Sequence, residues 1–265
     1  MNQTQIERTF EAKFPVAGPL TLDVRFDAGA LRVRSGEDGT VVVRGVLRRR
    51  ESFFAPGAAE RRMDELAANP PAVLEDASLR LGDAASGSLN GISALFDVTV
   101  PRATRVRAKS DSADFHLKGI DGPVECETDH GRIEASEIHS EVRVSSDHGN
   151  ITIRNVDGPV VVRADHSSIE ARDIAGRIDV RADSGSVFLS QTSAASIQVA
   201  SDSGDVSIRL AGGCGYSVSL ETDHGNLRFP QLENQQASGG RIRGNVRGGG
   251  PLVDARTDSG SIEIE

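Results

Sequence analysis

One short acidic phrase recurs at a nearly fixed spacing through most of this chain, and that spacing constrains the fold more than any other feature. The phrase is Asp, then His or Ser, then a small residue, as in "DHGR" at Asp129 and "DHGN" at Asp147. The first four intervals are 18 residues each, and the later ones are 19, 21 and 35. The eight aspartates are Asp111, Asp129, Asp147, Asp165, Asp183, Asp202, Asp223 and Asp258. A strict period of this kind is the signature of stacked repeats.

Each repeat contains two runs in which apolar residues alternate with polar ones. Ile133 and Ala135 form one such run, and Val142 and Val144 form the next. A period of two indicates a strand with one buried face. The small residues at the third and twelfth positions of the repeat mark tight corners between the strands. We therefore expect an all-β fold, a parallel β-solenoid whose 18-residue coils each contain two short strands and stack at about 4.8 Å.

An antiparallel sandwich remains an alternative, because turn signals every 8–12 residues or so also fit that architecture. Hairpins do not require one strict period, however, whereas stacked coils do. The regular period therefore favours the solenoid.

The whole chain of 265 residues is expected to form a single β-solenoid domain with local interruptions. Earlier coil-like phrases are "FDAGALRVR" from Phe26 and "GTVVVRG" from Gly39. A helix is expected within 55–68, because this stretch opens with Pro56-Gly57 and is followed by "NPP". The expected parts are 1–54 as N-terminal strands and an early coil, 55–94 as a helical and irregular insertion or cap, 95–229 as regular coils, 230–250 as a glycine-rich loop and 251–265 as a terminal coil.

Composition and charge exclude several classes of function. The net charge of −9 argues against binding to a nucleic-acid backbone. No stretch approaches the roughly 20 apolar residues that span a bilayer, so we expect no membrane segment. The opening residues lack the charged and apolar regions of a secretory signal, and the two cysteines form no disulfide framework. A cytoplasmic location is therefore expected.

The recurring aspartates are interpreted as a structural corner column. An Asp before Gly at a corner accepts backbone N–H bonds two residues on, and we expect neighbouring Ser or Thr hydroxyls to supply further donors. A calcium site is disfavoured because calcium-binding nonapeptides place Asp after a Gly pair, whereas here Asp precedes a single Gly.

Three histidines, His130, His148 and His166, follow these aspartates on successive repeats and are candidate ligands for a transition metal. Imidazoles on one edge are suitable ligands for zinc or nickel. A straight row does not surround an ion tetrahedrally, and Ser184 and Ser203 replace His in later repeats. We therefore expect exposed corner histidines, with no metal and no cofactor.

No spacing typical of a nucleophile with its base, a P-loop or a dinucleotide fingerprint is present, so the chain is not expected to be an enzyme. Outward positions form rows of mixed charge, such as Arg143, Val161 and Asp179. The one basic and aromatic cluster, "LRRRESFF" with Arg48–Arg50, Phe53 and Phe54, is interpreted as the entry to the helical insertion rather than as a partner site.

Residues 95–210 contain a "VTVP" strand followed by repeated phrases such as "TDHGRIEA" and "SDHGNITI". This pattern resembles the bacterial putative-adhesin family, a domain of unknown function. The resemblance implies a parallel β-coil and a bacterial origin, and it implies no catalytic residues.

The function expected is that of a non-catalytic scaffold or an adhesin-like interaction protein with a protein partner. A self-associating structural protein similar to the bactofilins is the alternative, and a polysaccharide-active β-helix enzyme comes third. The chain ends in "SIEIE", so Ile262 and Ile264 are expected on an open outer coil. Since unpaired strand edges recruit other strands, that edge predicts a weak homo-oligomer.

Overall fold

The computed structural model describes residues 5–50, 57–86 and 89–265. The chain is mostly β, as expected, and divides into two compact units, residues 1–128 (unit 1) and 129–265 (unit 2). The expectation of a single domain stays a prediction. Within the described ranges, no helix is both long and apolar enough to cross a membrane.

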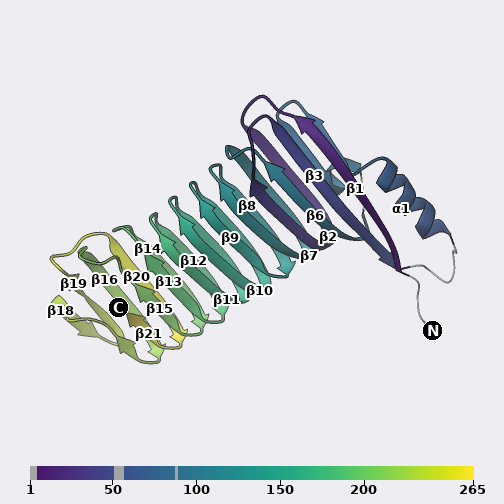
Figure 1. The fold of residues 1–265 in the computed structure, drawn as a ribbon. Helices are drawn as coiled ribbons and strands as arrows, with labels where there is room; N and C mark the ends of the chain where they lie inside the picture. The colour runs from purple at the N-terminus through teal and green to yellow at the C-terminus, as the bar shows by residue number, and fades with distance from the viewer. Residues whose placement is uncertain (1–4, 51–56, 87–88) are drawn as a thin grey trace. The chain divides into compact units, whose positions relative to one another are not determined.

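Unit 1 is built around one long strand, β2, which has parallel neighbours on both edges (Figure 1). Its β-strands are β1 (Gln5–Pro15), β2 (Leu20–Ser35), β3 (Thr40–Arg50), β4 (Ala72–Glu75), β5 (Ser78–Gly82), β6 (Ser93–Val100) and β7 (Thr104–Ile120), and β8 (Val124–His130) crosses the boundary between the units. β7 pairs along one edge of β2, while β5 and β6 share the other. Leu22 and Leu31 of β2 point inward and are fully buried. The residues "FDAGALRVR" therefore lie on a strand that has parallel neighbours, and the early coil stays a prediction.

The prediction that "GTVVVRG" continues this early repeat is wrong. These residues start β3, which pairs antiparallel with β6 on one side and with β1 on the other. An antiparallel pair of strands covers the edge of β6, so the hydrogen-bonding groups of that edge are satisfied within the chain.

The helix predicted over 55–68 is present as α1 (Ala58–Ala68), and residues 55 and 56 lie outside the described residues. It ends at Asn69, before the two prolines, as expected. Met63 and Leu66 are buried, and the Arg8 Nε atom of β1 lies 2.6 Å from Asp64 Oδ1. The helix therefore packs against the outermost strand of unit 1.

The rest of the segment 55–94 was expected to be irregular, and that expectation is wrong. β4 and β5 form an antiparallel hairpin, and the four-residue α2 (Asp83–Ser86) follows β5. β5 pairs with β2, so this segment contributes a strand to the repeats rather than only a cap.

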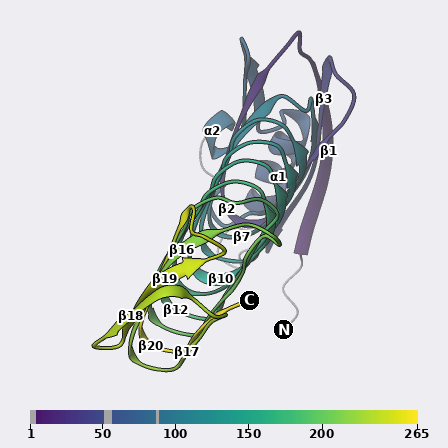
Figure 2. The same cartoon turned by 90° about the vertical axis from the view of Figure 1, so that its left-hand side faces the viewer.

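Unit 2 contains the most regular repeats. Its further strands are β9 (Ile133–Ile138), β10 (Val142–Val156), β11 (Val160–Ile174), β12 (Ile178–Ser184), β13 (Val187–Gln191), β14 (Ile197–Ser203), β15 (Val206–Arg209), β16 (Tyr216–His224), β17 (Leu227–Arg228), β18 (Glu233–Ser238), β19 (Arg241–Val246), β20 (Leu252–Ser259) and β21 (Ile262–Ile264). From β10 to β12 the strands pair in parallel with partners 18 residues apart, such as Val142 with Val160 and Val160 with Ile178. In Figure 2 these repeats are seen nearly end-on, each closing around a common interior.

The expectation that residues 251–265 form an open outer coil is wrong. β20 lies between β14 and β16, pairing Val253 with Ile197 on one edge and with Val218 on the other. β21 lies in the same way between β15 and β17. Ile262 is fully buried and Ile264 nearly so. Because both edges are occupied, this repeat offers no free strand edge to a second copy.

The glycine-rich loop expected over 230–250 is also different in the structure. It contains the antiparallel hairpin of β18 and β19, and β19 pairs with β16. Every residue of β18 is exposed, and its pairing shifts register between Glu233 and Gln236. An irregular polar strand at an edge is a known way of discouraging further pairing.

Candidate functional site

The three corner histidines of unit 2 form a regular stack, which we call the histidine ridge (His130, His148 and His166). The ring centroids of His130 and His148 are 5.1 Å apart, and those of His148 and His166 are 5.0 Å apart. The planes differ by only 5° and 4°. The spacing follows from the backbone, since neighbouring strands in a sheet lie about 4.8 Å apart.

The ridge continues along the same corner with small and polar residues. In β-sheet register, His166 is followed by Ser184, then by Ser203, Ser259 and His224. All three ridge histidines are exposed. The structure therefore brings the predicted residues together in one straight, accessible row.

The stack does not have the geometry of a metal centre. Parallel rings displaced along one axis present their nitrogens side by side, whereas a structural zinc site needs ligands that converge. In the described part of the chain, no group of three or more His, Cys, Asp or Glu side chains is arranged to hold a metal ion.

The aspartates of the corner column lie at the predicted corners, and all eight carboxylates are exposed. At two corners the buried hydroxyl beside the Asp bonds to the neighbouring repeat. Thr222 Oγ1 donates to the Gly260 carbonyl at 3.0 Å, and Thr257 Oγ1 donates to the Gly204 carbonyl at 3.4 Å. At two others, Ser146 Oγ and Ser201 Oγ are buried without a hydrogen-bond partner among the described residues. A Thr hydroxyl therefore links neighbouring repeats at some corners only.

Glycine is needed at these corners because the backbones of adjacent repeats approach closely. A Cβ atom on Gly149 would lie 1.9 Å from the Gly131 carbonyl oxygen, and the Gly149 φ of 155° is itself unfavourable for other residues. At the twelfth position, a Cβ on Gly158 would lie 2.4 Å from the Ser140 backbone. Both predicted corner positions are confirmed.

A third bend, present in four successive repeats, was missed in the sequence. Glu137, Asn155 and Asp173 all have left-handed backbone conformations, with φ of 56°, 53° and 57°. They occupy the ninth position of successive repeats, where Gly119 stands one repeat earlier. Asn and Asp tolerate this conformation better than most residues. The recurrence of Gly, Asn and Asp at the ninth position could therefore have predicted this bend from the sequence.

The outer faces carry the rows of mixed charge that the sequence predicts. Arg163 Nη1 lies 2.9 Å from Asp179 Oδ1, and Arg154 Nη2 lies 2.6 Å from Glu170 Oε1. The hydrogen bond from Arg154 lowers the pKa of the Glu170 carboxyl, and Arg172 adds to the effect. These pairs join neighbouring strands of the sheet.

Of the two thiols, Cys126 is fully buried and points into the core of unit 1. Burial raises the pKa of this thiol to about 12. A thiol of this kind remains protonated at neutral pH and is a poor nucleophile.

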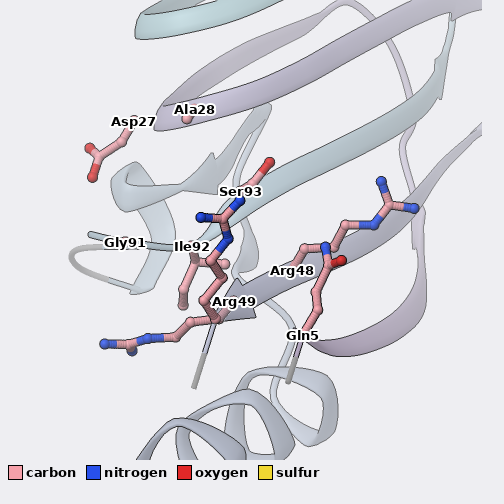
Figure 3. Close-up of a pocket in the computed structure, with 9 residues that line it drawn as sticks. Gln5, Asp27, Ala28, Arg48, Arg49, Gly91, Ile92 and Ser93 are labelled. Atoms are coloured by element: carbon pink, nitrogen blue, oxygen red, sulfur yellow. The ribbon is translucent and has the colours of Figure 1, made fainter. Parts of the chain in front are cut away.

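A hollow of about 650 Å³ lies in unit 1, where β3 ends beside the bend of β2 (Figure 3). We call it the arginine hollow. Its lining residues are Gln5, Asp27, Ala28, Arg48, Arg49, Arg50, Gly91, Ile92 and Ser93. Figure 3 shows Asp27 on one side and Arg48 and Arg49 of β3 on the other. The arginine run was interpreted as the entry to the insertion, and Phe53 and Phe54 of that cluster lie outside the described residues.

Comparison with known proteins identifies the family. A model of the Toastrack DUF4097 family matches residues 80–265, so the chain belongs to this family. The resemblance to bacterial putative adhesins is thereby confirmed.

A solved structure named as a putative adhesin from Bacteroides fragilis is 13% identical, with 97% of each chain covered and a TM-score of 0.50. A putative cell adhesion protein from Clostridium sporogenes is 15% identical over 97% of this chain and 99% of its own, with a TM-score of 0.29. No curated protein matches the chain. The similarity to the Bacteroides fragilis structure supports the fold and says nothing about the activity of this chain.

Proposed function

We propose that the chain is a bacterial, non-catalytic β-solenoid with coils of about 18 residues, and that it acts as a scaffold binding a protein partner along the histidine ridge. The observation that carries the proposal is the stack of exposed, parallel imidazoles with centroids 5.0–5.1 Å apart. A ridge fixed by strand pairing loses little conformational freedom on binding, which reduces the entropic cost of association.

Other features of the molecule support this class of function. The outer faces are ladders of paired charges, whose contribution to binding is small because they already satisfy one another. The strand edges of β20 and β21, on which self-association was expected, are occupied. This favours a scaffold over a self-associating filament. The relatives named as adhesins agree with an interaction protein.

The test compares two triple variants as bait in a bacterial extract. The ridge variant has His130, His148 and His166 changed to Ala, and the control has Ser145, Thr152 and Gln198 of the outer faces changed to Ala. We expect a protein that the wild type and the control retain and the ridge variant loses. Titration with the purified partner should then show an affinity at least about tenfold lower for the ridge variant. Equal retention by both variants would exclude the ridge as the binding surface.

A further inference from the structure

The arginine hollow has a surplus of positive charge that the described part of unit 1 does not neutralise. Arg48 is paired, since its Nε atom lies 2.7 Å from Glu7 Oε2. Arg49 and Arg50 have no carboxylate within ion-pair distance among the described residues. Several other arginines of the same sheet are paired, as Arg44 is with Glu11 at 2.9 Å.

Arg49 also occupies a position where the strand pattern calls for an apolar side chain. The preceding inward positions of β3 are Val41, Val43 and Leu47, all fully buried. Side chains alternate along a strand, so Arg49 belongs to the same inward row and is half-buried at its end. A guanidinium that is partly withdrawn from water is costly unless an anion compensates it.

The hollow has the size and the polar groups of a small-molecule site. Its volume of about 650 Å³ falls in the range usual for ligand pockets. Ile92 provides a buried apolar wall. On the side opposite the arginines, the Asp27 carboxylate is a hydrogen-bond acceptor. Desolvation raises the pKa of Asp27, with smaller contributions from Asp83 and Asp111. This carboxyl therefore lies close to other acids, and among the described residues no cation lies within ion-pair distance of it.

We propose that the arginine hollow binds a small hydroxylated oxyanion, with Arg49 and Arg50 holding the anionic group and Asp27 accepting a hydrogen bond from a hydroxyl of the ligand. The planar fork of arginine matches both carboxylate and phosphate, so a sugar acid and a sugar phosphate present the same chemistry to this site. The hollow is lined by residues of unit 1 alone and the ridge is formed by residues of unit 2, so this site does not depend on the proposed function.

The test is calorimetric titration of the full chain with glucose 6-phosphate, glucuronate, inorganic phosphate and neutral glucose. We expect one or both sugar anions to bind and glucose not to bind. Which anion binds shows whether the site takes a carboxylate, a phosphate or both. Arg49→Gln should weaken that binding about tenfold or more, and Arg49→Lys less. Asp27→Asn should weaken the sugar anions while leaving inorganic phosphate unchanged.

The matched control is Arg105→Gln, which changes an exposed arginine of β7 that does not line the hollow. It should bind as the wild type does. Melting curves of each variant show whether it is folded, so a loss of binding by a folded Arg49→Gln variant is informative. The proposal is overturned if the wild type binds neither sugar anion at about 1 mM, or if Arg49→Gln and Arg105→Gln bind alike.

Discussion

The repeats of β10 to β13 and the repeat of β20 and β21 share one sequence pattern but reach their places in unit 2 differently. The former stack in the order of the sequence, with Val142 beside Val160. The latter comes from the end of the chain and enters between two earlier repeats, with Val253 between Ile197 and Val218. The pattern of inward apolar residues therefore specifies that a segment fits the stack, but not where in the stack it lies.

Energetics explain why an insertion of this kind is tolerated. Pairing residues 56 apart, as Ile197 with Val253, rather than 18 apart costs only about 1 kcal/mol more in loop-closure entropy. In return, both edges of β20 form ladders of backbone hydrogen bonds. The cost is small beside the burial of several Val and Ile side chains.

Unit 1 also contains a strand that lies out of sequence order. Its strand β2 lies between β7 on one side and β5 with β6 on the other, although it precedes all three in the sequence. In both units an antiparallel pair of strands covers a neighbour of the displaced repeat. In unit 1, β3 pairs with β6 and β1 with β3; in unit 2, β19 pairs with β16 and β18 with β19. Displaced repeats and antiparallel edges thus occur together in each unit.

The largest effect is expected from removing residues 251–265. An inserted repeat supports both of its neighbours, so its loss exposes two strand edges and the partners of Val253 and Ile262, both fully buried. We expect a loss of about 5 kcal/mol or more of unfolding free energy, or loss of cooperative folding in this part of unit 2. Denaturant unfolding and limited proteolysis measure both.

The control for this truncation is Leu252→Ser in the full chain, because Leu252 is 51% exposed. It should change stability by less than about 0.5 kcal/mol. If residues 251–265 formed an outermost repeat, their removal would change the free energy of unfolding little. Near-wild-type stability of the truncated chain would therefore contradict the inserted position.

An intermediate effect is expected from alanine at equivalent corners of the two kinds of repeat. A Cβ at position 149 would lie 1.9 Å from the Gly131 oxygen, and a Cβ at position 260 would lie 2.1 Å from the Gly204 oxygen. Gly149→Ala and Gly260→Ala should therefore each cost about 2 kcal/mol or more, because the backbones must move apart. Thermal melting of both, with Gly212→Ala in open space as the control, measures the effect. A neutral Gly260→Ala would show that the inserted repeat packs less closely than the central ones.

The regular part of the fold was predictable because its signals are local. Alternation placed Ile133 and Val142 inward, and the period predicted the stacking of the histidine ridge. The order of the repeats was not predictable, because β20 satisfies the same local pattern whether it is outermost or inserted. Which edge it occupies depends on contacts between distant parts of the chain.

The site was predictable only in part, for a related reason. The corner positions of the aspartates followed from the period. The hydrogen bond of Thr222 did not, because its acceptor, the Gly260 carbonyl, is 38 residues away in the sequence. The arginine run at Arg48–Arg50 was visible, but Asp27 and Ile92, which complete the hollow, are distant in sequence.

The smallest effect concerns the charge ladders, and it compares the two kinds of repeat through their ion pairs. Arg154 and Glu170 join adjacent central repeats at 2.6 Å, and Arg209 and Glu265 join an earlier repeat to the inserted one at 2.9 Å.

The folded-state pKa of Glu170 is lowered from 4.5, chiefly by its hydrogen bond with Arg154. A lowered pKa means that the carboxylate stabilises the fold above its unfolded pKa, and that this stability is lost as the pH falls through the folded value. The pair is partly exposed, so a double-mutant cycle with Glu170→Gln and Arg154→Gln should give about 0.5 kcal/mol at pH 7. The coupling should vanish well below pH 4.5 and shrink in high salt. A coupling that is unchanged at low pH would show that packing of the two side chains, rather than their charge, links the repeats.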